Sequence, residues 1–377
     1  MKKITKHFNS LKKTHRDWLI LTAIFTFATI VLYSFIWFFM PGKLEVVYQN
    51  WDGPVYAVIA KTAYNPQQIT NLGWSNFKEP FDYASSFPLY PLFIRIFSFI
   101  GLFRAMILVS VLSSLGCIIA FYELVKKYQF SANPLLLSTI FIFLPPRWFI
   151  SSHIGSSEPL FILFIILSLN YFLGKKYFLS AMFLFFAQLT RSQGILFFAG
   201  FGFALLVPII KNHKLDIYSK FKEFISKFIY YLLGPIALLI VFSLFYIQYG
   251  NFFAFFTAMS KWHQMANYPF EVFASYPRQI VPTFWLEDHY WTYFFDVATI
   301  LLLFRKKLDS LAYIAILYFI PLTFVIHIDI SRYNLPLVPL SLIAIDSKAS
   351  TKLILIATLI LLPALLLYSA NFMLWNR

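Results

Sequence analysis

Clusters of Lys and Arg fall at alternate ends of the long apolar segments, and this alternation constrains the fold more than any other feature of the chain. The sequence contains about eleven apolar segments. They cover residues 18–40, 103–125, 134–150, 159–173, 177–189, 194–210, 228–249, 291–304, 311–327, 333–345 and 353–372. Several reach the ~20 residues that cross a bilayer, whereas the shorter ones must lie in thinned bilayer or inside the bundle. The pattern predicts an all-α polytopic membrane protein with about eleven transmembrane helices.

The basic clusters set the expected orientation. They precede the first apolar segment and fill every second connection, at Lys2, Lys3, Lys6, Lys12, Lys13, Arg16, Lys126, Lys127, Lys175, Lys176, Lys211, Lys214, Lys220, Lys222, Lys227, Arg305, Lys306, Lys307, Lys348 and Lys352. Because Lys and Arg are retained in the cytoplasm, we expect a cytoplasmic N-terminus with a basic tail at 1–17 and an extracytoplasmic C-terminus. The membrane is either the plasma membrane of a prokaryote or the endoplasmic reticulum of a eukaryote.

Composition supports a membrane protein and argues against other classes. Hydrophobic residues make up 60% of the chain and charged residues 12%, which is far from the balance of soluble globular proteins. The formal net charge of +15 is dispersed over short loops, so no nucleic-acid partner is expected. The lone Cys117 excludes an intramolecular disulfide and a Cys-based metal site. We expect one membrane domain over residues 1–377 that begins with an uncleaved signal anchor.

Two extracytoplasmic loops, at about 41–87 and 250–290, are longer than most connections and rich in aromatic residues. Each contains apolar residues at helical spacing, which predicts an amphipathic helix along the membrane surface. The spaced residues are Trp51, Val55, Ile59 and Ala63 in the first loop, and Phe252, Phe255, Phe256, Met259 and Trp262 in the second. The acidic cluster at 287–289 is interpreted as a solvated edge or the rim of an acceptor site.

Asp52 lies where the helix of the first loop should begin. An Asp at this position can cap the helix by accepting hydrogen bonds from first-turn amides, and Pro54 is tolerated in that turn. A catalytic carboxylate is the alternative, because the helix dipole also keeps the group ionised and ready to accept a proton. The local sequence does not decide between the two.

Five motif segments, spread in order over most of the chain, resemble the GPI mannosyltransferase II (PIG-V) family and its prokaryotic relatives. They are similar to that family's Trp-Asp, Phe-Phe-Pro-Leu-Tyr-Pro, Ser-Glu-Ser-Leu-Phe, Thr-Arg-Ser-Asn-Gly and Pro-Arg-Tyr-Leu-Leu-Pro motifs, and they lie at 50–56, 86–92, 156–161, 189–194 and 331–337. Pro159 and Ser331 depart from the family pattern. All five fall on the side expected to be extracytoplasmic.

The resemblance implies a GT-C fold and a membrane-embedded, inverting glycosyltransferase. Such an enzyme takes a hexose from a polyprenyl-phosphate or dolichyl-phosphate donor, and the family favours mannose. The acceptor would be a hydroxyl of a glycolipid, a lipid-linked glycan or a surface protein. Asp52 would be the general base, because the lipid phosphate is a good leaving group and only the acceptor hydroxyl must lose a proton. No cofactor is required by this chemistry.

Cations are expected where negative charge builds on the leaving phosphate. Arg332, Arg191 and Arg147 lie at extracytoplasmic ends of apolar segments, against the general trend of basic residues. Arg suits bidentate contact with phosphate, although interfacial Arg residues also extend to the headgroups of membrane lipids. Lys61, on the same expected helix as Asp52, is a weaker candidate for the phosphate.

Other polar residues could support the site. Glu158 begins an apolar segment, where a carboxylate is costly unless it is paired or faces a wet cavity; a charge that complements the helix dipole is its alternative role. Tyr333, inside a motif segment, is a further candidate, and Glu79 and Asp82 are secondary carboxylates. A divalent metal held by Asp52, His153 and Glu158 is left open, although their spacing matches no standard site.

A polytopic transporter or a flippase for lipid-linked sugars is the main alternative. Such proteins also combine many spans with polar residues, but they often contain inverted repeats and ionisable groups near the midplane of the bilayer. The sequence shows no internal repeat, and its notable charges lie at the ends of the segments.

Overall fold

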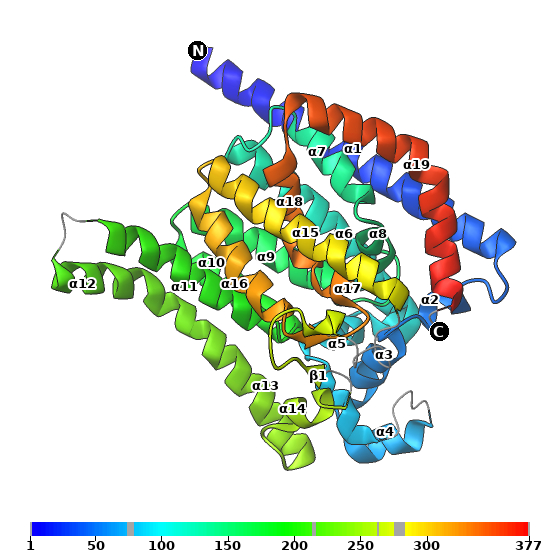
Figure 1. Cartoon of the computed structure of the whole chain (residues 1–377). Helices are drawn as coiled ribbons and strands as arrows, with labels where there is room; N and C mark the ends of the chain where they lie inside the picture. The colour runs from blue at the N-terminus through cyan, green and yellow to red at the C-terminus, as the bar shows by residue number, and fades with distance from the viewer. Residues whose placement is uncertain (1, 74–78, 213–215, 262–263, 275–282, 376–377) are drawn as a thin grey trace.

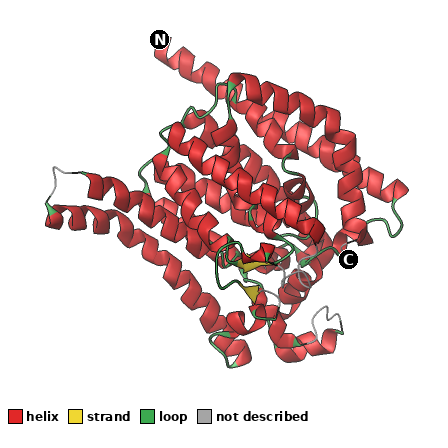
Figure 2. Cartoon of the chain, in the orientation of Figure 1, coloured by secondary structure: helices red, strands yellow, loops and turns green. Residues whose placement is uncertain are grey.

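The computed structural model describes residues 2–73, 79–212, 216–261, 264–274 and 283–375, and most of these are helical (Figures 1 and 2). The longer helices are α1 (Lys2–Phe39), α6 (Leu102–Lys127), α9 (Glu158–Leu173), α10 (Tyr177–Thr190), α11 (Gly194–Lys211), α12 (Ile217–Phe228), α13 (Leu233–Tyr249), α15 (Thr283–Arg305), α16 (Asp309–Leu322) and α19 (Lys348–Trp375). Among the described residues, five helical segments are long and apolar enough to cross a membrane. This confirms the prediction of an all-α membrane protein, whereas the count of about eleven spans and the GT-C arrangement stay predictions.

Prolines divide two of the apolar segments. The segment at 134–150 forms α7 (Pro134–Phe143) and α8 (Pro146–Ser151), with Leu144 extended between them. Proline disfavours the helical conformation of the residue before it, which explains the break before Pro145. The segment at 333–345 begins in the last residue of α17 (Ile330–Tyr333) and continues as the 3₁₀ turn η6 (Leu335–Leu337) and α18 (Val338–Ile345). Arg147 on α8 and Arg332 on α17, next to these breaks, are both buried.

The first long loop folds into short helices: α2 (Glu45–Tyr48), α3 (Gly53–Thr62), α4 (Pro66–Leu72) and η1 (Pro80–Ser85). Two further short helices, α5 (Leu89–Ile96) and η2 (Ser98–Ile100), follow the loop and lead into α6. Helix α3 packs against α5 and α6, and nearly all of its side chains are buried. The helix expected near Asp52 therefore exists. It lies inside the protein, however, and the prediction that it rests along a membrane surface is wrong.

The second long loop contains α14 (Ala254–Met259), the strand β1 (Gln264–Met265) and the 3₁₀ turn η4 (Glu271–Phe273). Strand β1 pairs antiparallel with β2 (Val325–Ile326), with Gln264 opposite Ile326. Helix α14 packs on η1 of the first loop, so the two long loops meet. Trp262, predicted on the helix of this loop, lies outside the described residues. The loop also ends earlier than expected, because α15 already begins at Thr283.

The bundle has two chemically different ends. At the basic end, where α6 finishes, Trp18 donates to Glu123 and Tyr122 donates to Asp17. At the opposite end, where α6 begins, α6 contacts α3 and α5. This end contains Asp52 and is called the site end below. The 26 residues of α6 separate these ends by ~39 Å at 1.5 Å per residue. Helices α1 and α19 lie side by side along one edge of the bundle and both finish near α2, towards the site end (Figure 1).

Candidate active site

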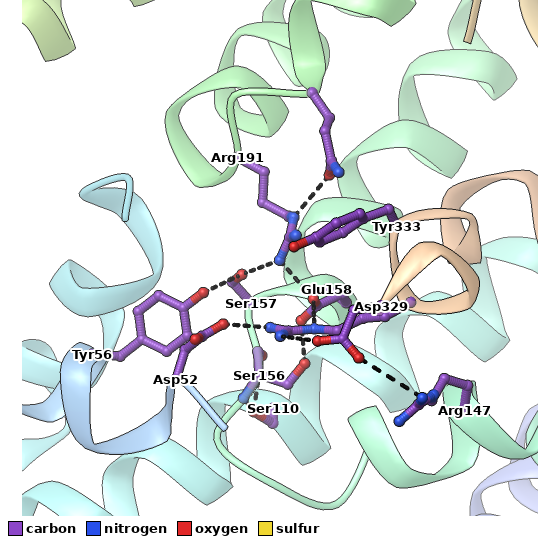
Figure 3. Close-up of polar contacts among 12 residues, drawn as sticks. Asp52, Tyr56, Ser110, Arg147, Ser156, Ser157, Glu158, Arg191, Asp329 and Tyr333 are labelled. Carbon is purple, nitrogen blue, oxygen red and sulfur yellow. Dashed lines mark hydrogen bonds and ion pairs between the residues drawn. The ribbon is translucent and has the colours of Figure 1, made fainter. Parts of the chain in front are cut away.

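Charged side chains from distant parts of the chain form one network at the site end (Figure 3). Among the described residues, its members are the cations Arg147, Arg191 and Arg332 and the carboxylates Asp52, Glu158 and Asp329. The cations and carboxylates alternate, so that each guanidinium contacts at least one carboxylate. Because uncompensated charges are costly to bury, this alternation is what allows the network to lie inside a helical bundle.

Asp52 is the exposed member of the network. It precedes α3, and its backbone carbonyl accepts a hydrogen bond from Tyr56 N at 3.0 Å. In the described structure its side chain makes no capping hydrogen bond and instead accepts from Nη2 of Arg332 at 2.6 Å. The side chain is 42% exposed, against 5% for Arg332. The carboxylate is thus held on one side by a buried cation and is open on the other.

A close approach of two glycines brings Asp52 to the rest of the network. A Cβ added to Gly155 would lie 2.9 Å from the Cα of Gly53, closer than real Cβ contacts allow. Only a residue without a side chain fits at Gly155, and the approach sets the start of α3 against the turn that leads into Glu158. Tyr56, one turn into α3, completes this contact through a 2.9 Å hydrogen bond between its hydroxyl and Ser157.

Trp51 adopts an unusual backbone conformation next to Asp52. Its φ of 48° lies in the left-handed region, which costs a non-glycine residue roughly 1–3 kcal/mol and is found most often at functional sites. The guanidinium carbon of Arg332 lies over the indole ring, 4.4 Å from the ring centroid. The guanidinium carbon of Arg147 lies 5.4 Å from the same centroid. The rings of Trp51 and Phe372 of α19 meet in a T-shaped contact with their centroids 5.2 Å apart. The strained residue therefore joins two cations of the network to the last helix.

Glu158 is the centre of the network. It begins α9 and is 1% exposed, and its Oε1 accepts from Nη1 of Arg191 at 2.6 Å and from Nε of Arg332 at 2.5 Å. The hydroxyl of Ser156 donates to its other oxygen. The position at the start of a 16-residue helix also favours a negative charge. Both roles expected from the sequence, a paired carboxylate and a charge at a helix start, apply to the same group.

Arg191 connects Glu158 to neighbouring polar groups. It follows the end of α10 in an extended conformation, and it donates from Nε to Gln193 at 3.0 Å and from Nη1 to Ser157 at 2.9 Å.

Tyr56 lies beside these groups. Burial, followed by the charge of Asp52, raises the pKa of Tyr56 well above its usual range. The phenol of Tyr56 thus stays protonated beside these groups. Figure 3 places Tyr333 next to Arg191, at the edge of the same network.

Asp329 was not predicted as a site residue, because it lies outside the motif segments. It lies 3.7 Å from Nη2 of Arg147 and 4.0 Å from Nη1 of Arg332, and so links the two cations. It directly precedes the short helix α17, three residues before Arg332, and this spacing is the signal that could have identified it. Burial raises the pKa of Asp329 above its usual range, against the opposing effects of Arg332 and Arg147.

Arg147, on α8, is only 6% exposed and is surrounded mainly by aromatic rings. Its guanidinium lies 4.4 Å from the ring centroid of Phe372 and 5.4 Å from that of Trp285. Its ion pair with Asp329, at 3.7 Å, is longer than a hydrogen bond. Among the described residues its Nη1 has no hydrogen-bond partner. The alternative expected for Arg147, extension to lipid headgroups, does not fit this burial.

Three other predicted site residues lie elsewhere. Lys61 is exposed in the last turn of α3, about 13 Å along the helix from Asp52. Glu79 and Asp82 pair with Lys261, at 3.0 and 2.6 Å, where the two long loops meet. These contacts fasten the loops to each other.

The metal site left open by the sequence is not formed. His153 is fully buried on the side of α1, where Nε2 lies 2.9 Å from the Thr29 hydroxyl and Nδ1 lies 2.7 Å from the carbonyl of Phe149. Its ring is therefore engaged away from Asp52 and Glu158. The described residues contain no group of three or more His, Cys, Asp or Glu side chains placed to hold a metal ion.

The cluster at 287–289 is part of helix α15 and not of a loop. His289 is fully buried and its Nε2 contacts the carbonyl of His327 at 2.8 Å. The expectation of a solvated edge is therefore wrong for this residue, because the helix turns it into the bundle.

Comparisons of the chain with protein-family models and with curated proteins find no match.

Proposed function

We propose that the protein is a membrane-embedded, inverting glycosyltransferase that moves a hexose from a polyprenyl-phosphate donor to an acceptor hydroxyl. The observation that carries the proposal is the state of Asp52. Its carboxylate is 42% exposed, it does not cap its helix in the described structure, and it is oriented by a buried Arg. This is the arrangement that a general base needs when its substrate arrives from outside the protein.

The convergence of the motif segments supports the same activity. Four of the five supply members of the network: Asp52, Glu158, Arg191 and Arg332. The remaining segment, at 86–92, supplies Tyr90, whose ring meets that of Tyr56 at 4.9 Å. Segments that resemble one enzyme family by sequence alone therefore meet at one place. Chance resemblance would not favour such a meeting.

The proposed reaction is a single displacement. The acceptor oxygen forms a bond to the anomeric carbon while the bond from that carbon to the phosphate oxygen breaks. The acceptor proton passes to Asp52, and the bonding electrons leave with the polyprenyl phosphate. Because attack comes from the face opposite the phosphate, the anomeric configuration is inverted. Cations near the leaving phosphate lower the barrier, since its negative charge increases during the step.

Mannose is the proposed sugar, because the resemblance favours it, and the proposed acceptor is embedded in the membrane. The decisive test is transfer of radiolabelled mannose from polyprenyl-phosphate mannose by the purified protein in nanodiscs. The acceptor would come from a lipid extract of a deletion strain, which should accumulate the acceptor one sugar short. Incorporation by the wild-type protein, and its loss in Asp52→Asn, is the expected result.

A transport assay separates the alternative class. Proteoliposomes that carry a labelled lipid-linked sugar in one leaflet would report its movement to the other leaflet. Movement without any sugar transfer, tested with mannosyl, glucosyl and galactosyl donors, would replace the proposed enzyme with a flippase.

A further inference from the structure

Asp296 is a buried carboxyl group that lies outside the charged network. It is on α15 and is 1% exposed, and its Oδ1 accepts a hydrogen bond from Nδ2 of Asn334 at 2.6 Å. The ion pairs of the described residues all involve other carboxylates. An isolated ionised carboxylate is very costly to bury, so a group in this position is expected to lose its charge.

The helices packed on α15 supply no cation to Asp296. Helix α15 contacts α16, α17 and α18 (Figure 1). Over the described residues of these three helices, Arg332 is the only Lys, Arg or His. Its guanidinium donates to Glu158 and Asp52. The charge of Arg332 is thus already compensated by other carboxylates.

Two phenols interact electrostatically with Asp296 but direct their protons elsewhere. Tyr318 of α16 donates to the carbonyl of Tyr333 at 2.7 Å. Tyr293 of α15 donates to the carbonyl of Leu322 at 3.3 Å. Neither phenol therefore provides the donor that a buried carboxylate oxygen needs.

The contact between Asp296 and Asn334 leaves two oxygens without a donor. Among the described residues, Oδ2 of Asp296 and Oδ1 of Asn334 are both buried and have no hydrogen-bond partner. Each belongs to the same planar group as an atom of the existing hydrogen bond. A proton on Oδ2 would turn it into a donor to Oδ1, so that acid and amide form two antiparallel hydrogen bonds. The same proton removes the buried charge.

This contact is also close to the charged network. Asn334 follows the end of α17, two residues after Arg332, so the contact fastens the turn that carries Arg332 to α15. We infer that Asp296 is a neutral carboxylic acid, joined to the Asn334 amide by two hydrogen bonds, and that this pair positions Arg332 beside Asp52. The effect on catalysis rests on the proposed function, whereas the protonation of Asp296 does not.

A cation held between the two oxygens is the alternative way to satisfy them. Ca²⁺ and Mg²⁺ take about six or more oxygen ligands, whereas a proton needs only the two oxygens of the pair. Asp296→Asn separates the two cases. The new amide can still accept from Nδ2 of Asn334 and donate to its Oδ1, but it carries no charge for a cation.

Infrared spectroscopy of the full chain in nanodiscs measures the protonation of Asp296 directly. A protonated acid has a carbonyl stretching band that a carboxylate lacks, and the difference spectrum between wild type and Asp296→Asn at neutral pH should contain this band. Asp216→Asn is the control, because it replaces an exposed carboxylate and should remove carboxylate bands instead. Loss of carboxylate bands in Asp296→Asn would overturn the inference.

Kinetics test the positioning role. Asp296→Asn keeps both hydrogen bonds, so turnover should stay close to wild type. Asp296→Leu leaves the Asn334 amide unpaired and should lower kcat at least about tenfold with little change in the KM for the donor, since small misplacements of reacting groups are costly in rate. Thr299→Val removes the next contact between α15 and α18, a 2.9 Å hydrogen bond to Ser341, and should have little effect. If Asp296→Asn is as impaired as Asp296→Leu, the group is needed as a charge and the inference is wrong.

A double variant distinguishes loss of the pair from a general loss of folding. Asp296→Leu combined with Asn334→Leu removes both polar partners, and such a replacement can be nearly neutral for stability. The double variant should therefore unfold at a higher temperature than either single variant, while kcat stays low because the turn is no longer held. A loss of thermal stability equal to the sum of the two single losses would contradict the pair.

These outcomes also separate the inference from the proposed function. An acid band that disappears in Asp296→Asn, in a protein that transfers no sugar, would support the pair and contradict the glycosyltransferase. Sugar transfer at the same kcat by wild type and Asp296→Leu would leave the enzyme standing and overturn the positioning role of Asp296.

Discussion

Nη2 of Arg332 donates a 2.6 Å hydrogen bond to Oδ2 of Asp52, and this bond joins residues 280 positions apart. The Arg is buried and the Asp is partly exposed, so the pair has a protected cation and an accessible carboxylate. Nε of Arg332 also donates to the buried Glu158, and this second contact fixes the orientation of the guanidinium. An acceptor hydroxyl can therefore reach Asp52 without disturbing the buried contacts that hold it.

Replacement of Asp52 by Asn should separate catalysis from structure. The Asn side chain can still accept a hydrogen bond from Arg332, and the replaced carboxylate is partly exposed, so the free energy of unfolding should change by less than about 1 kcal/mol. Loss of the proton acceptor should lower the rate of sugar transfer by at least about a hundredfold. Initial rates and thermal unfolding in the same detergent measure the two effects.

Asp216 provides the matched control for this substitution. It caps α12 by accepting a hydrogen bond from Ser219 N at 3.3 Å, and Asn caps nearly as well as Asp. Asp216→Asn should leave both stability and transfer close to wild type. If Asp52→Asn behaves like Asp216→Asn, Asp52 is not the base.

Arg332 should be sensitive even to a conservative change. Arg332→Ala leaves Glu158 and Asp52 each short of a partner, and breaking a buried pair costs about 3–5 kcal/mol. Arg332→Lys keeps the charge but cannot donate to both carboxylates in the same geometry, so stability and turnover should recover only in part. Thermal unfolding and the kcat and KM for the donor distinguish the contributions. A Lys variant equal to wild type in all three would show that the fork geometry is unimportant.

Removal of the charge at Glu158 should destabilise the protein strongly. Glu158→Gln leaves Arg191 and Arg332 buried with less compensation, and we expect a loss of about 3–5 kcal/mol. Glu223→Gln is the control, because Glu223 pairs with Lys227 while 37% exposed and such pairs contribute at most about 1 kcal/mol. Chemical denaturation of both variants would test the contrast. Equal stability would mean that the network does not depend on Glu158.

Much of the fold could be predicted from the sequence. Each apolar segment contains a helix, because lipid-facing and buried helices leave a strong compositional signal, although the segment at 311–327 ends in strand β2. The environment of α3 was mispredicted, since the spacing of Val55 and Ile59 marks one buried face but does not show that the opposite face is buried as well. The start of α15 was missed because Glu287 and Asp288 interrupt the apolar pattern that identifies a segment.

The site was only partly predictable for a related reason. Motif resemblance pointed to Asp52, Glu158, Arg191 and Arg332, and the structure brings all of these together. The resemblance could not supply Asp329, which lies outside the motifs, or show that His153 is turned away from Asp52. Such long-range contacts depend on tertiary packing, and a single sequence carries little trace of them.

Lys261 should hold the two long loops together. Hydrogen bonds from Lys261 to Asp82 and then to Glu79 raise the pKa of the Lys above its usual range, so the ammonium is charged at every pH at which the protein would be assayed. Lys261→Met should increase proteolysis of the loops, because Asp82 is 4% exposed and loses its partner. Glu79→Gln should have little effect, since Glu79 is 65% exposed. Indistinguishable digestion of the two variants would contradict the role given to Lys261.

The expected orientation can be tested by labelling introduced cysteines in intact cells. Cys117→Ser supplies a background without thiols and keeps a donor for the carbonyl of Pro159, which Sγ of Cys117 contacts at 3.0 Å. Gln67, on α4 at the site end, and Lys222, on α12 in a basic connection, are both exposed. Because basic connections remain in the cytoplasm, an impermeant maleimide should label Gln67→Cys directly and Lys222→Cys only after permeabilisation. The reverse pattern would place Asp52 on the cytoplasmic side, and the proposed extracytoplasmic transfer would then be impossible.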